Sequence, residues 1–269
     1  MAAADNGTSL AGRTALAIFA HPDDESLACG GTLARLADAG ARVVLLCASR
    51  GERGHTVDAA LVPNGDLGAV RSAELHDAAN VLGISDVIIL NHPDGDLRWD
   101  RVEELEHDIL SAIDTYTPEV VITFDEDGLY WHLDHIGVFE RTSTAVGTLG
   151  AKAPALYHVT MPQGVMREVA EAAASKGWAP PGSTFWGIAP ELFGLETDHP
   201  TLTVDVRDWA ARKLAALRCH RTQVGPTNPF ACIEQTDARR WLGVELFRRA
   251  PHGSGETMLD QIGEPVLSS

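Results

Sequence analysis

Short runs of apolar residues alternate with longer segments in which apolar positions recur every three or four residues. The apolar runs predict five buried strands, over residues 14–20, 42–49, 86–90, 119–124 and 155–160. The periodic segments predict helices over 25–40, 67–83, 99–116, 134–150 and, later, 208–223. Near-continuous apolar strands that alternate with helices are typical of a mostly parallel sheet with helices on both faces. We therefore expect a Rossmann-like α/β fold.

The pattern weakens after about residue 161, where one late strand is predicted over 201–206. The chain contains no internal repeat and no linker-like stretch, so we expect one domain over 1–269 with a core over about 14–160. We expect the loop-rich segment 161–269 to complete a substrate pocket. Its 177–190 stretch is rich in glycine and proline and carries Trp178, Phe185 and Trp186. These side chains either form an apolar lid over a ligand or form a hydrophobic plug that holds the loop against the protein.

Composition narrows the partners. The 269 residues are 45% hydrophobic, enough for a sizeable core, and the formal net charge is -17. Such an acidic chain disfavours nucleic-acid backbones and anionic membrane surfaces. The sequence begins with no signal-like segment and contains no run long enough to span a membrane, so a cytoplasmic protein acting on a small molecule is expected. No pattern predicts an oligomeric state.

Titratable side chains gather where the predicted strands end. Because the carboxyl ends of parallel strands meet at one edge of a sheet, these groups are expected to share a site. Any one of them alone is explained equally well as a solvated loop residue. The groups are His21, Asp23 and Asp24 after the first strand, Ser49, Arg50 and Glu52 after the second, His92, Asp94 and Asp96 after the third, and Asp125, Asp127, His132, Asp134 and His135 after the fourth.

Two short motifs carry metal-binding chemistry. In "HPDDE", His21 and Asp24 are three residues apart, and imidazole and carboxylate are good zinc ligands. A helix N-cap would explain one of the adjacent acids but neither the histidine nor the second acid. In "HLDH", His132 and His135 share a helical face, so one can bind metal while the other faces substrate. Together the motifs supply three protein ligands and an open position, as in catalytic zinc sites.

Several segments resemble the PIG-L/LmbE-like zinc-dependent N-acetylglucosaminyl deacetylases. They are "AHPDDE", "SRGERG", "RSAEL", "PDGDL" and "TFDEDGLYWHLDH", in this order, and they cover about residues 14–147. The later "KLAALRCHRTQ" also looks like a helix of that family. The resemblance implies an LmbE-like fold, one zinc ion per chain and removal of acetyl from an N-acetylglucosamine-type group.

The resemblance also implies roles for single residues. His21, Asp24 and His135 become the zinc ligands, Asp23 the general base, and His132 a catalytic histidine whose protonated form stabilises the oxyanion. Asp134 is expected to orient an imidazole from outside the ligand set. Arg71 and Asp94 match positions that contact the sugar. Leu133 departs from the proline that is usual in the family, which could alter the angle at which His135 approaches the metal.

The identity of the acceptor stays open between several substrates. The aromatic 177–190 loop favours a bulky acceptor, such as the pseudoaglycone of a glycopeptide in antibiotic biosynthesis. The alternative is the GlcNAc-inositol deacetylase of the mycothiol pathway or the related mycothiol-conjugate amidase, and free or oligomeric GlcNAc is a third class. A metal-dependent phosphoesterase would want a second metal ion. A sugar-binding module would need neither Asp23 nor His132. His92 and His220 are expected either to reach the pocket or to serve packing.

Overall fold

The computed structural model describes residues 9–178, 184–194, 200–226 and 228–266. Within these residues one sheet has eight strands in the order β3-β2-β1-β4-β5-β7-β6-β8. The first five strands pair in parallel, and the last three pair antiparallel at one side. The strands are β1 (Thr14–Phe19), β2 (Arg42–Cys47), β3 (Asp86–Ile89), β4 (Val120–Phe124), β5 (Ala155–Thr160), β6 (Leu202–Asp205), β7 (Val244–Arg249) and β8 (Glu264–Pro265). The mostly parallel sheet confirms the prediction.

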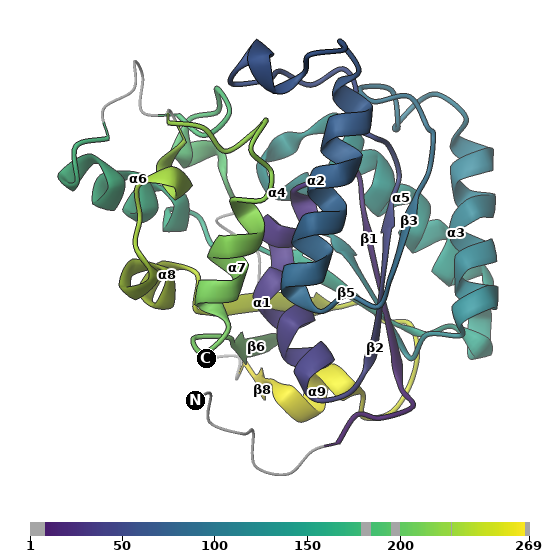
Figure 1. Cartoon of the computed structure of the whole chain (residues 1–269). Coiled ribbons are helices and arrows are strands. Elements are labelled where there is room, and N and C mark those ends of the chain that lie inside the picture. Colours follow the sequence, from purple (N-terminus) through teal and green to yellow (C-terminus); the bar gives the residue numbers. More distant parts are fainter. Residues whose placement is uncertain (1–8, 179–183, 195–199, 227, 267–269) are drawn as a thin grey trace.

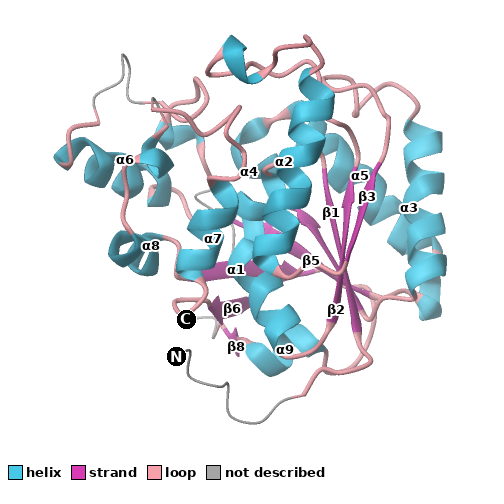
Figure 2. Ribbon diagram, viewed as in Figure 1, coloured by secondary structure: helices cyan, strands magenta, loops and turns pink. Residues whose placement is uncertain are grey.

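Helices cover both faces of the sheet (Figures 1 and 2). On one face, α1 (Asp24–Asp38), α2 (Leu67–Leu82) and α7 (Ala210–Leu217) pack side by side. On the other, α3 (Val102–Tyr116) packs against α5 (Leu133–Thr148). This double cover explains why β4 and β5 are buried along their whole length rather than on alternate residues.

The C-terminal part forms a second hydrophobic cluster beside the main core. It includes α6 (Val165–Ser175) and α8 (Gln235–Trp241), and Trp178, Phe185, Phe193 and Phe230 are buried there. Of the loop aromatics, Trp178 and Phe185 therefore act as the plug. The short α4 (Gly128–Trp131) and α9 (Met258–Ile262) complete the helices of the described chain.

The elements of this part differ from the prediction in two respects. The late strand is confirmed as β6, but α6 and β7 were not predicted. The helix expected over 208–223 ends at Leu217, and the chain then turns. It turns because His220 and Thr222 bond to side chains of α1 and α2 instead of following the helix axis.

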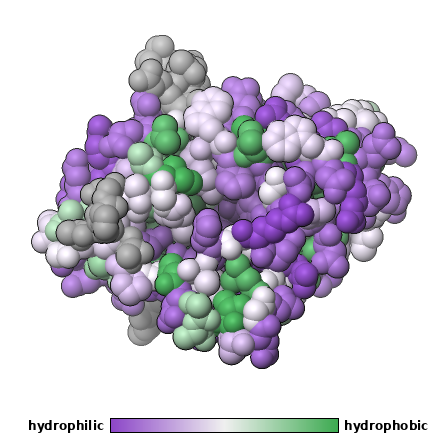
Figure 3. All heavy atoms as spheres, turned by 90° about the horizontal axis from the view of Figure 1, so that it is seen from above, coloured by the Kyte–Doolittle hydropathy of each residue, from purple (hydrophilic) through white to green (hydrophobic). Residues whose placement is uncertain are grey.

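The carboxyl ends of β1 to β4 meet at the upper edge in Figure 1. Figure 3 shows the molecule from above, where hydrophilic side chains cover most of the surface and hydrophobic ones form separate patches. No helix of the described residues has the length and apolar character needed to cross a membrane. Helices α1 and α5, whose first residues belong to the "HPDDE" and "HLDH" motifs, begin at the carboxyl edge of the sheet.

Candidate active site

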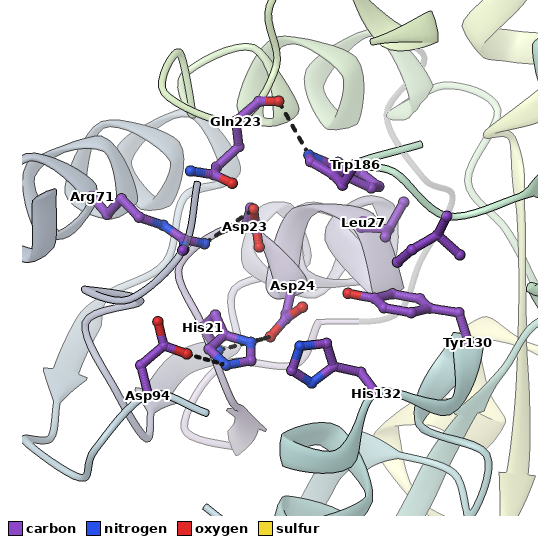
Figure 4. Close-up of a pocket in the computed structure, with 12 residues that line it drawn as sticks. His21, Asp23, Asp24, Leu27, Arg71, Asp94, Tyr130, His132, Trp186 and Gln223 are labelled. Atoms are coloured by element: carbon purple, nitrogen blue, oxygen red, sulfur yellow. Dashed lines mark hydrogen bonds and ion pairs between the residues drawn. The ribbon is translucent and has the colours of Figure 1, made fainter. Parts of the chain in front are cut away.

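A pocket of about 160 Å³ opens at the carboxyl edge of the sheet (Figure 4). Strand ends supply one wall, and the C-terminal part supplies the opposite wall. The lining residues are His21, Asp23, Asp24, Leu27, Gly54, Arg71, Asp94, Tyr130, His132, Trp186, Ile188 and Gln223. The two parts of the chain therefore meet at the pocket; that segment 161–269 completes a substrate pocket stays a prediction.

The three predicted zinc ligands, His21, Asp24 and His135, come together at this pocket. His21 Nδ1 lies 3.3 Å from His135 Nε2 and 3.5 Å from Asp24 Oδ2, and His135 Nε2 lies 3.2 Å from Asp24 Oδ1. All three side chains are buried. A tetrahedral zinc ion with bonds of about 2.0–2.1 Å holds its ligand atoms about 3.3 Å apart. The donor types and their separations therefore fit zinc.

The ring orientation of His135 suits metal binding. Its Nδ1 lies 3.0 Å from the carbonyl oxygen of Gly128, to which it donates. The ring also stacks on Phe124, the last residue of β4, with 4.1 Å between ring centroids. The proton is thus held at Nδ1, so Nε2 keeps a free lone pair on the side of His21 and Asp24.

The opposite nitrogen of His21 faces two carboxylates. Its Nε2 lies 3.1 Å from Asp134 Oδ2 and 3.1 Å from Asp94 Oδ1. Burial alone would lower the pKa of His21, but hydrogen bonds to Asp134, Asp24 and Asp94 raise it well above its ordinary value. Asp134 itself accepts from the backbone N–H groups of Gly95 and Leu97, at 2.6 and 3.0 Å. Asp134 thus contacts an imidazole outside its own motif.

His132 lies beside the same cluster as the N-cap residue of α5. Its Nδ1 accepts from the backbone N–H of Asp134 at 3.2 Å. Its ring stacks on His135. With His21 and His135 it forms a group of three imidazoles that could also hold a metal ion. Burial, then the neighbouring His135 and His21, lowers the pKa of His132 to about 3. This geometry therefore favours the neutral ring, in which Nε2 carries the proton, and the protonated imidazole expected during the reaction stays a prediction.

Asp23 has an unusual backbone and a perturbed carboxyl group. Its φ of 120° lies in the region that favours glycine. Its Oδ2 accepts from Arg71 at 3.2 Å, and the same guanidinium donates to the carbonyl oxygens of Pro22 and Gly51. Burial raises the pKa of Asp23 to about 6, against the lowering effect of Arg71. A carboxylate of this kind can take up and release a proton near neutral pH.

Arg71 and Asp94 line the pocket but are already engaged. Asp94 Oδ2 accepts from the backbone N–H of Arg53 at 2.7 Å, while Oδ1 faces His21. Although burial opposes it, hydrogen bonding to His21 leads the interactions that lower the pKa of Asp94 to about 2. Asp94 is therefore an anion that is fixed between a loop and an imidazole.

The remaining acids and histidines from the strand ends serve packing. Asp125 forms an ion pair with Arg248, and Asp127 accepts from the backbone N–H of Leu129 at 3.1 Å. His92 does not line the described pocket, and its Nε2 bonds to Asp108 at 2.9 Å. His220, from the late helical segment, is buried and does not line the pocket.

Two lining residues lie within the segments that carry the family resemblance, although no role in the pocket was predicted for them. Tyr130 lies in "TFDEDGLYWHLDH", two residues before His132, and Gln223 is the last residue of "KLAALRCHRTQ". Trp186 Nε1 donates to the carbonyl oxygen of Gln223 at 3.1 Å, and Gln223 Nε2 donates to that of His55 at 2.8 Å. Of the aromatic loop, Trp186 and Ile188 reach the pocket. Only the fold brings Gln223 there.

Known proteins share this sequence and this architecture. The family model "PIG-L: GlcNAc-PI de-N-acetylase" matches residues 16–146. A 1D-myo-inositol 2-acetamido-2-deoxy-alpha-D-glucopyranoside deacetylase of Thermobispora bispora is 31% identical, with 88% of each chain covered. The chain belongs to this deacetylase family. Membership makes it an N-deacetylase, a hydrolase of N-acetyl amides.

Solved structures agree on the fold. N,N'-diacetylchitobiose deacetylase of Pyrococcus horikoshii is 26% identical with a TM-score of 0.59, covering 93% of this chain and 87% of its own. A deacetylase of the teicoplanin biosynthetic pathway, solved as a triple mutant, is 20% identical with a TM-score of 0.58, covering 89% of this chain and 99% of its own. The expected LmbE-like α/β fold is confirmed.

Proposed function

We propose that this chain is a zinc-dependent hydrolase that removes the acetyl group from GlcNAc-inositol. The observation that carries the proposal is the buried cluster of His21, Asp24 and His135 with Asp23 beside it in the pocket. The choice of substrate follows the Thermobispora bispora relative, whose printed name specifies that sugar.

This substrate replaces the bulky glycopeptide acceptor that the sequence favoured. That acceptor was favoured because the 177–190 loop is aromatic. Trp178 and Phe185 pack in the second hydrophobic cluster, however, so Trp186 is the aromatic residue of this loop that lines the pocket. The teicoplanin enzyme resembles this chain at 20% identity, a likeness of fold only. The alternative of a mycothiol-pathway sugar is therefore the better supported.

The proposed ligands are His21 through Nδ1, His135 through Nε2, and Asp24. Zinc bound there would activate a water molecule and polarise the amide carbonyl of the substrate. Asp134 holds a proton of His21 on Nε2, so that bound zinc would take the place of the proton on Nδ1. This assigns Asp134 the orienting role expected from the sequence, with His21 as its target.

Asp23 is proposed to move the proton. Its carboxylate takes a proton from the attacking water and delivers it to the amide nitrogen, which leaves as the free amine. A pKa of about 6 suits both halves of this task. Arg71 keeps the carboxylate in place through its 3.2 Å contact. The bond that breaks is the amide C–N bond, and acetate takes up the oxygen of the water.

His132 is proposed to stabilise the developing oxyanion. As a neutral ring with its proton on Nε2, it can donate a hydrogen bond to the former carbonyl oxygen. In this neutral state it carries no second proton for the departing amine, so the proposal assigns that protonation to Asp23. Arg71 and Asp94 remain the proposed contacts to sugar hydroxyls, since both line the pocket.

Acetate release from a small panel tests the substrate. We expect GlcNAc-inositol to exceed free GlcNAc, an N-acetylglucosaminyl glycopeptide and a mycothiol conjugate by at least about tenfold in kcat/KM, a difference of about 1.4 kcal/mol. A preference for the glycopeptide would instead support the bulky acceptor that the sequence favoured. No acetate from any of the four would overturn the proposal.

Metal content tests the ligand set. We expect one zinc ion per chain, lost in Asp24→Ala and retained in His132→Ala. The reverse result would make His132 the third ligand. A second metal would support a phosphoesterase, and His21, Asp94 and Asp134 do form a second candidate group. Both oxygens of Asp134 already accept backbone N–H groups, which argues against that second ion.

A further inference from the structure

Directly behind the pocket lies a buried pair that the mechanism does not use. His220 Nε2 lies 2.9 Å from Glu25 Oε1, and both side chains are fully buried. Neither lines the pocket. Burying a charged carboxylate is costly unless its partners compensate, so a pair that adds nothing but packing would be an expensive choice. Glu25 also contacts Asp23, which gives the pair a second effect.

The contact between Glu25 and Asp23 acts on the backbone. Asp23 has φ 120° and ψ -24°, a strained conformation that persists only where the surroundings impose it. Its N–H donates to Glu25 Oε2 at 3.1 Å. On the other side of the same peptide group, Arg71 donates to the carbonyl oxygen of Pro22 at 2.7 Å. The peptide between residues 22 and 23 is therefore held at both ends.

We propose that Glu25 and His220 are positioning residues for the general base. His220 fixes the carboxylate of Glu25, Glu25 fixes the N–H of Asp23, and the strained backbone then directs the Asp23 side chain into the pocket. The inference rests on the proposed function, since it assumes that Asp23 acts as the base. It assigns the C-terminal part a role in the reaction itself, through a residue that touches neither substrate nor metal.

The chain around His220 is anchored so that it can serve as a fixed support. Thr222 donates to Glu74 of α2 twice, from its backbone N–H at 3.0 Å and from Oγ1 at 2.6 Å. Both Thr222 and Glu74 are buried. This second pair attaches the same turn to a neighbouring helix but makes no contact with Asp23. It offers a matched control for loss of buried hydrogen bonds in this turn.

The kinetic experiment compares His220→Ala and Glu25→Ala with Thr222→Val. We expect kcat to fall about 10- to 100-fold in the first two, because displacement of a catalytic group by about 1 Å has effects of that size. KM should stay within about twofold and zinc content should be unchanged. Thr222→Val should lower the melting temperature while kcat stays within about twofold.

Conservative variants separate positioning from packing. His220→Gln can still donate to Glu25, and Glu25→Gln can still accept from the N–H of Asp23, so each should recover part of the kcat lost in its alanine variant. A purely structural pair predicts instead that all variants lose thermal stability alike while kcat per folded molecule is unchanged. That outcome, or a loss confined to KM or to zinc content, would overturn the proposal.

A crystallographic measurement makes the test independent of the substrate. In His220→Ala and Glu25→Ala we expect the φ of Asp23 to return to negative values, while in Thr222→Val it stays near 120°. If the wild type released no acetate but φ changed in this way, the proposed function would fail and the positioning would stand. If φ stayed positive in both alanine variants, the positioning would fail whatever the activity.

Discussion

The parallel half of the chain, residues 14–160, and the C-terminal half contribute to the pocket in different ways. In the first, the strand ends place His21, Asp24 and His135 within 3.5 Å of one another. In the second, Trp186 and Gln223 reach the pocket from irregular segments, and one or two side-chain hydrogen bonds hold each of them. One wall is positioned by the sheet, and the other by contacts that must form individually.

This difference suggests a division of labour. Groups at the strand ends need rigid placement, because bond making and breaking tolerate little displacement. Groups on irregular segments can vary without disturbing the sheet, and they suit recognition of the acceptor. We therefore expect changes at the strand ends to remove the reaction and changes at Trp186 or Gln223, which line the pocket, to alter KM. His220 does not line the pocket and supports Asp23, so it falls outside this division. The predictions below run from the largest expected effect to the smallest.

The largest effect is expected for Asp23→Asn. The amide keeps the shape and tolerates a positive φ, but it cannot take up a proton. We expect kcat to fall about 10³-fold with zinc retained, measured by acetate release and metal analysis. Asp96→Asn is the matched control, because this exposed acid pairs with Arg53 at a neighbouring strand end. Activity within tenfold of wild type in Asp23→Asn would remove Asp23 from its role.

The ligand positions could be predicted because two regularities act together. An i, i+3 spacing puts His21 near Asp24 locally, and parallel pairing of β1 with β4 brings His135 to the same edge. What could not be predicted is which face of His21 meets which acid. Asp94 approaches Nε2 from the loop after β3 and Asp134 from the first turn of α5, and their approach depends on side-chain packing that no spacing encodes.

The second prediction concerns the pH dependence set by Arg71. Activity requires deprotonated Asp23, so kcat/KM should rise with pH through the pKa of that group, about 6 in this structure. The guanidinium of Arg71 lowers this pKa. In Arg71→Gln the pKa should therefore rise and the acidic limb should move to higher pH, with activity at pH 7 reduced about tenfold.

The control for this prediction is Arg53→Gln. The side chain of Arg53 is exposed and pairs with Asp96 rather than with Asp23. The acidic limb of the pH profile of Arg53→Gln should match that of the wild type. A limb that moves to lower pH in Arg71→Gln, or does not move, would contradict the assignment of the acidic limb to Asp23.

The C-terminal half was harder to predict for a physical reason. The apolar periodicity of 208–223 is helical, yet the helix ends at Leu217 because Glu25 and Glu74 offer His220 and Thr222 stronger partners. Local propensity is a weak preference that such contacts override. β7 was missed because its pairing with β5 and β6 joins distant segments. Trp186 was already a candidate from its aromatic loop, whereas the place of Gln223 in the pocket had to come from the structure.

The third prediction tests the acceptor wall through Trp186→Ala. Removing this ring should raise KM for GlcNAc-inositol about 5- to 10-fold, consistent with about 1–1.5 kcal/mol for an aromatic contact, and leave kcat within about twofold. Trp99→Ala is the control, since Trp99 is exposed and does not line the pocket. A fall in kcat with unchanged KM would show that the acceptor wall itself serves the chemistry and would end this division between the two walls of the pocket.

The smallest effect is expected where the chain departs from the usual family motif. Leu133 is exposed and is the first residue of α5, a position that favours proline. His132 before it has φ -68° and ψ 124°, which proline also requires of its predecessor. Leu133→Pro should therefore raise the free energy of unfolding by about 0.4–1 kcal/mol, measured by denaturant titration, with kcat within about twofold. Since His135 already lies 3.2 Å from Asp24 with leucine in place, a loss of zinc in this variant would show that Leu133 sets the approach of His135 after all.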